Sequence, residues 1–244
     1  RSIICRSSIE CFTIPKSVVT LKDGCFEMAS KLNKIKIMEG NKQFKYYKNK
    51  IIIGKKEPEN EEYNELIFVP KEIKKVTIPS FINRISAFSF ENSQIECIFI
   101  PSSVEEIGEK AFYSCHSLKE VKFSKYSKLR SIGKSAFAFT HIESITIPAT
   151  VTEIGSEWIG GYQQLSFIEI DENNKNFKLF ENKFIIGKSD QKSDEFDTII
   201  SLPYDIKDVV VPSFIKIIAS GAFSYSNVES VIIPSSVIEI GESS

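Results

Sequence analysis

The chain has 244 residues, of which 42% are hydrophobic and 26% are charged, and its formal net charge is −1. These proportions are typical of a folded protein, and the balance of 31 basic and 32 acidic residues argues against a nucleic-acid or membrane-surface binder, which needs excess basic charge. No apolar run reaches about 18 residues, so we expect no membrane contact by this segment.

The chain repeats itself at two periods. Shifted by 133 positions, residues 1–111 align without a gap on residues 134–244, so that Pro15 meets Pro148 and Pro79 meets Pro212. A shorter period of about 22–24 residues lies inside the long one, and such periods are typical of solenoids. The chain is therefore predicted to form one array over residues 1–244, with about nine rungs.

The first element of each repeat is a hexad with apolar first, fourth and sixth residues, which predicts a strand. A proline follows most hexads and ends the strand, because proline has no N–H for a ladder. Stacked about 5 Å apart, nine hexads would form one parallel sheet about 45 Å long on the concave side. The hexads are Ile9–Ile14, Leu32–Ile37, Ile73–Ile78, Ile95–Ile100, Leu118–Phe123, Ile142–Ile147, Leu165–Ile170, Ile206–Val211 and Val228–Ile233.

Two further segments complete each repeat. In one, Val104 and Ile107 are predicted to turn inward and Gly108 to permit the bend. In the next, the Ala111-Phe112 pair points inward from a short helical or turn-like stretch on the convex side. Equivalent pairs recur in other repeats: Cys25-Phe26, Ser89-Phe90, Ala136-Phe137 and Ala222-Phe223.

Two repeats are longer, and their extra residues predict β-hairpin insertions near residues 41–70 and 174–203. Asn49 and Asn182 stand at the two turns, where asparagine tolerates the left-handed conformation. We expect the hairpins to project from the solenoid at matching places in the two halves.

The repeat pattern hexad-Pro-Ser-Ser-Val-x-x-Ile-Gly-x-x-Ala-Phe, matched best by Ile100–Phe112, Ile132–Phe137 and Ile147–Gly155, resembles the BspA-like leucine-rich repeats. The insertions Asn41–Phe44 and Asn174–Phe177 resemble that family's longer repeat variant. The resemblance implies a leucine-rich-repeat solenoid, an α/β horseshoe, from a cell-surface or extracellular protein of protist or bacterial type. A cytoplasmic location is not excluded by the residues.

Few residues are suited to catalysis or metal binding. Cys115 beside His116 is a candidate dyad, but neighbouring side chains usually point apart and the cysteine stands at a core position. The acidic loops Glu57–Glu65 and Asp190–Asp197 lack the alternating ligands and glycine of a calcium loop. Trp158 beside Gly160-Gly161 is interpreted as local repacking. We predict no enzyme, no cofactor and no metal.

The cysteines are odd in number and include no C-x-x-C pair, which argues against a zinc site or a dense disulfide framework. Their redox state is left open. They are Cys5, Cys11, Cys25, Cys97 and Cys115.

The outward residues of the hexads, their third and fifth, form the candidate partner-binding face. Exposed aromatic side chains often mark interfaces, although a merely solvated sheet is the alternative interpretation. The candidate residues are Lys34, Lys36, Lys75, Phe99, Lys122, Phe167, Glu169, Asp208 and Ile232.

These observations predict a non-catalytic module that binds a protein or another macromolecule, as part of a surface adhesin or antigen. The alternative is a structural spacer or stalk in a longer protein. Arg1–Ser8 aligns with Lys134–His141 and no capping turn is visible, so we interpret the chain as a fragment of a longer array.

Overall fold

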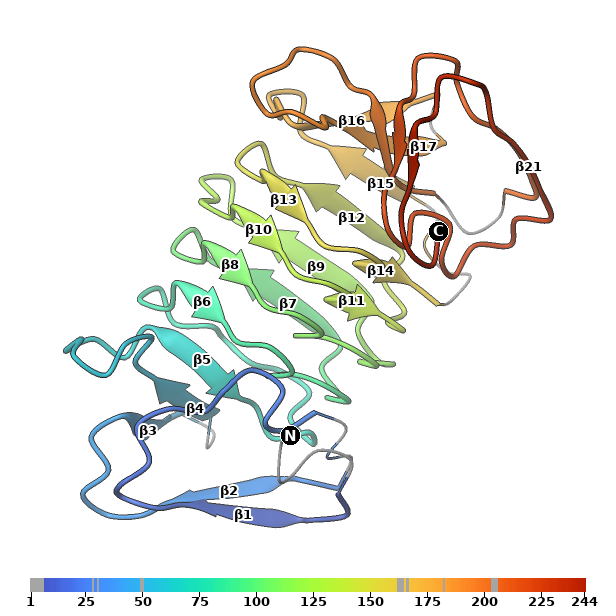
Figure 1. The fold of residues 1–244 in the computed structure, drawn as a ribbon. Helices are drawn as coiled ribbons and strands as arrows, with labels where there is room; N and C mark the ends of the chain where they lie inside the picture. The colour runs from blue at the N-terminus through green and yellow to red at the C-terminus, as the bar shows by residue number, and fades with distance from the viewer. Residues whose placement is uncertain are drawn as a thin grey trace.

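The computed structural model describes residues 7–27, 29, 31–48, 51–161, 165, 167–181, 183–202 and 206–244. Figure 1 shows a chain that winds through stacked turns from the N-terminal to the C-terminal end. Within these residues every regular element is a strand. The fold is a leucine-rich-repeat β-solenoid, and the helices expected on its convex side are absent from the described turns.

The hexads form the first sheet, and their third to sixth residues are the strands. Along each strand exposed and buried side chains alternate, as the apolar spacing predicts. All neighbouring strands are parallel, but they pair in three separate groups, β1–β2, β7–β9–β12–β15 and β19–β21. The strands are β1 (Cys11–Ile14), β2 (Lys34–Ile37), β7 (Cys97–Ile100), β9 (Glu120–Phe123), β12 (Ser144–Ile147), β15 (Phe167–Ile170), β19 (Asp208–Val210) and β21 (Ser230–Ile232).

The prediction of one continuous nine-strand sheet is therefore wrong. The hexad Ile73–Ile78 forms no strand. The Tyr46 hydroxyl donates to the Ile35 carbonyl at 2.8 Å and accepts from the Ile37 N–H at 3.0 Å. The Tyr46 hydroxyl thus bonds backbone groups on the edge of β2 that faces away from β1.

A second series of strands is formed by the two residues before the glycine of each Ile-Gly pair, and these strands belong to two separate sheets, one of seven strands and one of five. A Cβ on Gly108 would lie 2.5 Å from the backbone nitrogen of Ala87 in the preceding turn, and one on Gly155 would lie 2.4 Å from that of Lys134. Glycine is required here because consecutive turns approach closely. The short strands are β6 (Arg84–Ile85), β8 (Glu106–Ile107), β10 (Ser131–Ile132), β13 (Glu153–Ile154), β20 (Ile217–Ile218) and β22 (Glu239–Ile240).

The two predicted hairpins are present, since β3 pairs antiparallel with β4 and β16 with β17. They do not project, however, because each continues one of these two sheets: β5 pairs with β6 in the seven-stranded sheet, and β18 pairs with β20 in the five-stranded sheet. All residues of β4 and β5 are buried. The strands are β3 (Phe44–Tyr47), β4 (Ile51–Gly54), β5 (Glu65–Phe68), β16 (Phe177–Phe180), β17 (Phe184–Gly187) and β18 (Thr198–Ser201).

The side chain of an asparagine connects each hairpin to the preceding turn by hydrogen bonds. The Asn41 side-chain amide donates to the Pro15 carbonyl at 2.8 Å, and its oxygen accepts from the Phe44 N–H at 2.9 Å. Asn174 makes the equivalent bonds to Pro148 and Phe177. The turn residues Asn49 and Asn182 lie outside the described residues.

The hairpins also divide the apolar interior into three core clusters. Ile52 packs in the N-terminal cluster, whereas Ile51 and Ile53 pack in the middle cluster. In the second half Ile185 belongs to the middle cluster and Ile186 to the C-terminal one. Successive side chains of a strand point to opposite faces, so each hairpin is a wall with core on both sides.

The segments with the Ala-Phe pairs form a third side of each turn, beside the two series of strands, and we call this side the third wall. Its hydrogen bonds explain why the expected helices are absent from the described residues. Each turn places left-handed residues four positions apart, such as Lys110 (φ 52°) and Ser114 (φ 56°). Backbone amides alternate: Phe112 N–H donates to Ala136 of the next turn at 2.8 Å, whereas Tyr113 N–H donates to Lys110 in its own turn at 3.1 Å. This alternation links consecutive turns and is incompatible with a right-handed helix. Among the residues that the structure describes, only β11 (Phe137–Ala138) and β14 (Ile159–Gly160) are regular strands in this wall.

Aromatic rings stack along the interior of this wall. The Phe112 ring lies 4.6 Å from Phe90 and 5.1 Å from Phe137, and in the following turn Ile159 stands opposite Phe137, with the buried Trp158 at the position of Ala136. A Cβ on Gly161 would lie 2.6 Å from the Phe139 ring. Glycine at this position thus makes room for a neighbouring aromatic ring, and the interpretation of Trp158 as local repacking stays a prediction.

Candidate functional site

The four-strand group of the first sheet carries the best-defined part of the predicted face. Its register places Phe99 opposite Lys122, and Thr146 opposite Glu169. A second row is formed by Cys97, Glu120, Ser144 and Phe167, and every residue of both rows is exposed. We call these eight residues the hexad patch.

Two aromatic side chains stand at diagonally opposite corners of the hexad patch. Phe99 is 55% exposed and Phe167 is 57% exposed. Between them the Lys122 ammonium lies 2.7 Å from a Glu120 carboxylate oxygen, which raises the pKa of Lys122. The Thr146 hydroxyl donates to Glu169 at 3.0 Å. The patch therefore offers two apolar anchors around a polar centre, an arrangement suited to protein contacts.

A groove of about 490 Å³ runs beside the hexad patch. Phe99 and Lys122 line it on the sheet, and Thr150 and Asp171 line it on the turns that follow. Its remaining polar residues include Lys125, Ser124 and Ser127. The groove combines an aromatic ring, ammonium groups and hydroxyls, so it can accept both apolar and hydrogen-bonding groups of a partner.

The other predicted face residues are exposed but lie elsewhere. Lys34 and Lys36 are on β2, in the β1–β2 group, whereas Asp208 on β19 and Ile232 on β21 belong to the β19–β21 group. Lys75 is exposed in the hexad that forms no strand. The structure therefore brings Phe99, Lys122, Phe167 and Glu169 together and leaves the remaining five apart from them.

The Cys115–His116 pair is not arranged for catalysis. Cys115 is fully buried, its thiol donates to the Phe90 carbonyl at 2.9 Å, and burial raises its pKa to about 12. A thiol held protonated is not an active nucleophile. His116 is exposed, and its carbonyl contacts Nδ1 of His141.

The described residues contain no group of three or more histidine, cysteine, aspartate or glutamate side chains that could hold a metal ion. In the same part of the chain no helix is long and apolar enough to cross a membrane. Cys11, Cys97 and Cys115 are free thiols, and Cys5 lies outside the described residues.

Sequence reasoning missed a second hollow, which lies beside the second hairpin and which we call the hairpin pocket. Its volume is about 850 Å³. Its lining is aromatic, aliphatic and charged and comprises Lys178, Phe180, Asp194, Glu195, Phe196, Asp197, Ser213, Phe214, Lys216, Ser236 and Ile238. The available signal was Pro-Ser-Phe: phenylalanine replaces the second serine of Pro-Ser-Ser only at Phe81 and Phe214, in the turns that follow the hairpins.

Comparison with known proteins agrees with this architecture. A family model described as "BspA type Leucine rich repeat region" matches six copies over residues 2–51, 61–184 and 201–244. No curated protein matches the chain in sequence.

Three solved structures share the fold. The pneumococcal vaccine antigen PcpA is 21% identical with a TM-score of 0.58, and the alignment covers 96% of this chain and 47% of that one. A leucine-rich repeat protein from Eubacterium ventriosum is 18% identical (TM-score 0.56; 97% and 51% covered), and a leucine-rich cell surface protein from Faecalibacterium prausnitzii is 21% identical (0.52; 98% and 59%). The chain thus spans only about half the length of these structures.

Proposed function

Because the chain belongs to the BspA-type leucine-rich repeat family, we propose that it is a non-catalytic binding module of a cell-surface protein and that the hexad patch contacts a protein partner. Two of the structurally similar proteins are described as a vaccine antigen and a cell surface protein, which supports the proposed location. Repeat arrays commonly bind partners through extended faces.

The observation that carries the proposal is the exposure of Phe99 and Phe167 beside buried neighbours on the same strands. Ile98 is 3% exposed and Ile168 is 9% exposed, so the alternation that builds the core also presents the two rings to solvent. Large aromatic side chains in such positions supply much of the binding energy at protein interfaces. The ion pair between Glu120 and Lys122 would provide orientation rather than affinity, since exposed ion pairs contribute little.

The experiment compares binding of the purified chain to a panel of immobilised extracellular proteins with that of the double variant Phe99→Ser/Phe167→Ser. We expect affinity to fall by about 2 kcal/mol or more for any protein that uses the hexad patch. Val19→Ser is the matched control, because Val19 is also 55% exposed but lies in the first turn. Binding that survives the double variant would remove the patch from consideration.

The alternative role, a structural spacer or stalk, is distinguished by the same experiment. A spacer would bind no member of the panel, and its variants would differ from the wild type in nothing but local stability. An assay of the purified chain against generic hydrolase substrates tests the non-catalytic assignment, for which we expect no turnover.

A further inference from the structure

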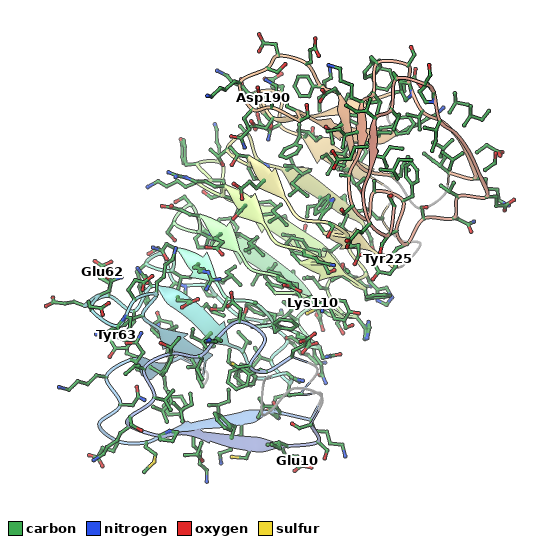
Figure 2. The ribbon with its side chains drawn as sticks, viewed as in Figure 1. Glu10, Glu62, Tyr63, Lys110, Asp190 and Tyr225 are labelled. Carbon is green, nitrogen blue, oxygen red and sulfur yellow. The ribbon has the colours of Figure 1, made fainter. Side chains whose placement is uncertain are left out.

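Strand β15 ends the four-strand group of hexads and has an unpaired edge among the described residues. It pairs with β12 on one side, whereas the next hexad forms β19, which pairs with β21. The first half has the same interruption, since in the described part of the chain β2 pairs only with β1. Figure 2 shows Glu10, directly before β1, and Asp190, in the loop of the second hairpin, at opposite ends of the stack. Each half thus contains one interrupted hexad sheet.

The backbone groups of Ile168 and Ile170 face the unpaired edge of β15. The Asp171 N–H donates to the Ile147 carbonyl at 3.0 Å, just beyond the ends of β15 and β12. Because successive residues of a parallel strand direct their backbone groups to opposite sides, Glu169 also faces β12, and Ile168 and Ile170 face away from it. No described residue makes a hydrogen bond to the Ile168 carbonyl or the Ile170 N–H across this edge.

In the first half a side chain makes the two equivalent bonds. The Tyr46 hydroxyl donates to the Ile35 carbonyl and accepts from the Ile37 N–H. In a parallel ladder one residue of the next strand would make both bonds, so this hydroxyl imitates one residue of an added strand. The 133-residue shift places Leu179 at the position of Tyr46. Since leucine has no hydroxyl, the edge of β15 lacks this substitute.

A hollow beside β2 shows that the interruption leaves room next to the strand. Its volume is about 380 Å³, and it is lined by Asn33, Lys34, Ile35, Tyr46, Pro70 and Glu72. It therefore lies between β2 and the segment that leads into the hexad without a strand. The two hairpins pair in the same register, with Phe44 opposite Gly54 and Phe177 opposite Gly187, so the two halves share this scaffold.

The outward side chains of β15 favour particular residues in an added strand. Phe167 and Glu169 are exposed, and in parallel register the third and fifth residues of the added segment would lie beside them. A basic fifth residue is complementary to the Glu169 carboxylate. The fourth and sixth residues would continue the inward rows of Ile168 and Ile170, which favours apolar side chains there.

We propose that the edge of β15 binds an extended segment of a partner protein, which adds to the sheet as a parallel strand. The main-chain groups of the segment would bond Ile168 and Ile170, and its alternating side chains would give specificity. The inference rests on the proposed function, because the added strand would lie beside Phe167 of the hexad patch, and it states how the partner binds there.

The test is an amide chemical-shift titration of the whole ¹⁵N-labelled chain with the capped peptide acetyl-Ser-Leu-Lys-Glu-Val-Lys-Phe-Ser-amide. This peptide copies residues 117–124, a hexad with a basic fifth residue. We expect saturable shifts at Ile168 and Ile170. Methylation of the backbone nitrogen of the second lysine, which would bond the Ile168 carbonyl, should weaken binding by about fivefold or more.

The matched control is the same peptide methylated on the backbone nitrogen of its valine. That N–H would face away from β15, so we expect binding within about twofold of the unmodified peptide. Absence of shifts at Ile168 and Ile170, or equal binding of the two methylated peptides, would overturn the proposal. Because this comparison uses the wild-type chain, it does not depend on the folding of a variant.

Two substitutions at Leu179 locate the site. Leu179→Tyr installs the residue of the first half, whose hydroxyl would bond the Ile168 carbonyl and the Ile170 N–H, and it should weaken the peptide by about fivefold or more. Leu179→Phe adds the ring without the hydroxyl and should weaken it less than the tyrosine variant. Equal binding of the peptide to the two variants would contradict the assignment.

The edge and the hexad patch can fail separately. Binding of a panel protein that is lost in Phe99→Ser/Phe167→Ser but unchanged in Leu179→Tyr would keep the hexad patch and overturn strand addition. Peptide shifts at Ile168 and Ile170, together with panel binding that survives Phe99→Ser/Phe167→Ser, would support the edge and remove the patch.

Discussion

At the scale of single residues, Arg84 is the most highly connected charge in the described part of the chain. Its guanidinium lies 2.9 Å from Asp23 and 2.9 Å from Glu106, and it also pairs with Glu65. These partners come from the first turn, the hairpin strand β5 and the following turn β8, so one side chain links several layers of the stack. Glu65 is nearly buried, and the Ser86 hydroxyl donates to it at 2.7 Å.

We predict that Arg84→Met lowers the free energy of unfolding by about 2–3 kcal/mol, because it leaves the Glu65 carboxylate buried without its cation. Urea unfolding followed by the fluorescence of Trp158, the one tryptophan, measures the loss. The matched control is Glu65→Thr/Arg84→Ile, which installs the residues of the second half, Thr198 and Ile217, and should recover most of the stability. A double variant as unstable as Arg84→Met would contradict this account.

The ionisation of Asp197 makes the free energy of unfolding depend on pH. Burial alone would raise its pKa, but the Ser189 N–H and hydroxyl donate to its carboxylate at 2.9 and 2.8 Å, and with Thr198 and Lys216 they hold the pKa below the ordinary value of 3.8. A lowered carboxylate pKa contributes stability that is present above the pKa of the unfolded chain and is lost as pH falls through the folded value.

The wild type should therefore lose more unfolding free energy than Asp197→Asn between about pH 5 and pH 2. Asparagine stands at the equivalent position in the first half, as Asn64, so the variant suits the fold. Urea unfolding at several pH values gives the change of unfolding free energy with pH for each protein. The same change in both proteins would rule out the role of Asp197.

At the scale of elements, the third wall shows how a segment that resembles a helix in sequence becomes a ribbon of turns. Short turns such as Lys110–Cys115 could form one helical turn, but the neighbouring turns lie close enough to accept every second amide. Those bonds require the left-handed residues that flank each Ala-Phe pair. Bonding between turns therefore overrides local helix propensity.

We predict that Ser114→Val destabilises the protein by about 1–2 kcal/mol, because a β-branched residue is strained at a positive φ. Ser102→Val is the control, since Ser102 lies in the turn after Pro101 and is absent from the left-handed positions; we expect a cost below about 0.5 kcal/mol. Trp158 fluorescence in urea measures both, and equal losses would show that backbone strain is not the cause.

The sequence predicted the hexad strands, the prolines that end them and the antiparallel hairpins, because apolar spacing and proline act locally. It could not predict the missing strand at Ile73–Ile78, because that hexad has the same apolar spacing as the hexads that form strands. Nor could the sequence show that the hairpins are buried. The run Ile51, Ile52 and Ile53 is equally compatible with a buried strand and with an exposed one. Phe99 and Phe167 were placed correctly because outward positions follow from alternation alone.

At the scale of the whole molecule, the hairpins separate the interior into regions that are stabilised by different residues. Ile52 and Ile53 are both fully buried and adjacent in sequence, yet they pack in the N-terminal and middle clusters respectively. Because each turn of a solenoid contacts only its neighbours, such a wall limits how far a local loss of packing can spread.

Ile52→Ala and Ile53→Ala should therefore destabilise different parts of the chain, although each costs about 2–4 kcal/mol. Hydrogen exchange measured by mass spectrometry should accelerate mainly in residues 11–37 for Ile52→Ala and mainly in residues 82–112 for Ile53→Ala. Each variant is the control for the other, and the same exchange pattern in both would show that the interior unfolds as one unit.

The two-sided burial of the hairpins also governs how the array responds to tension. When the chain is pulled from its ends, ordinary turns detach one after another, because each is held only by the next one. Extracting a hairpin strand exposes two cores at once, so it requires more force than detaching a turn. The two hairpins would then act as mechanical stops, and a pulled molecule would lengthen in bursts separated by pauses at residues 44–68 and 177–201.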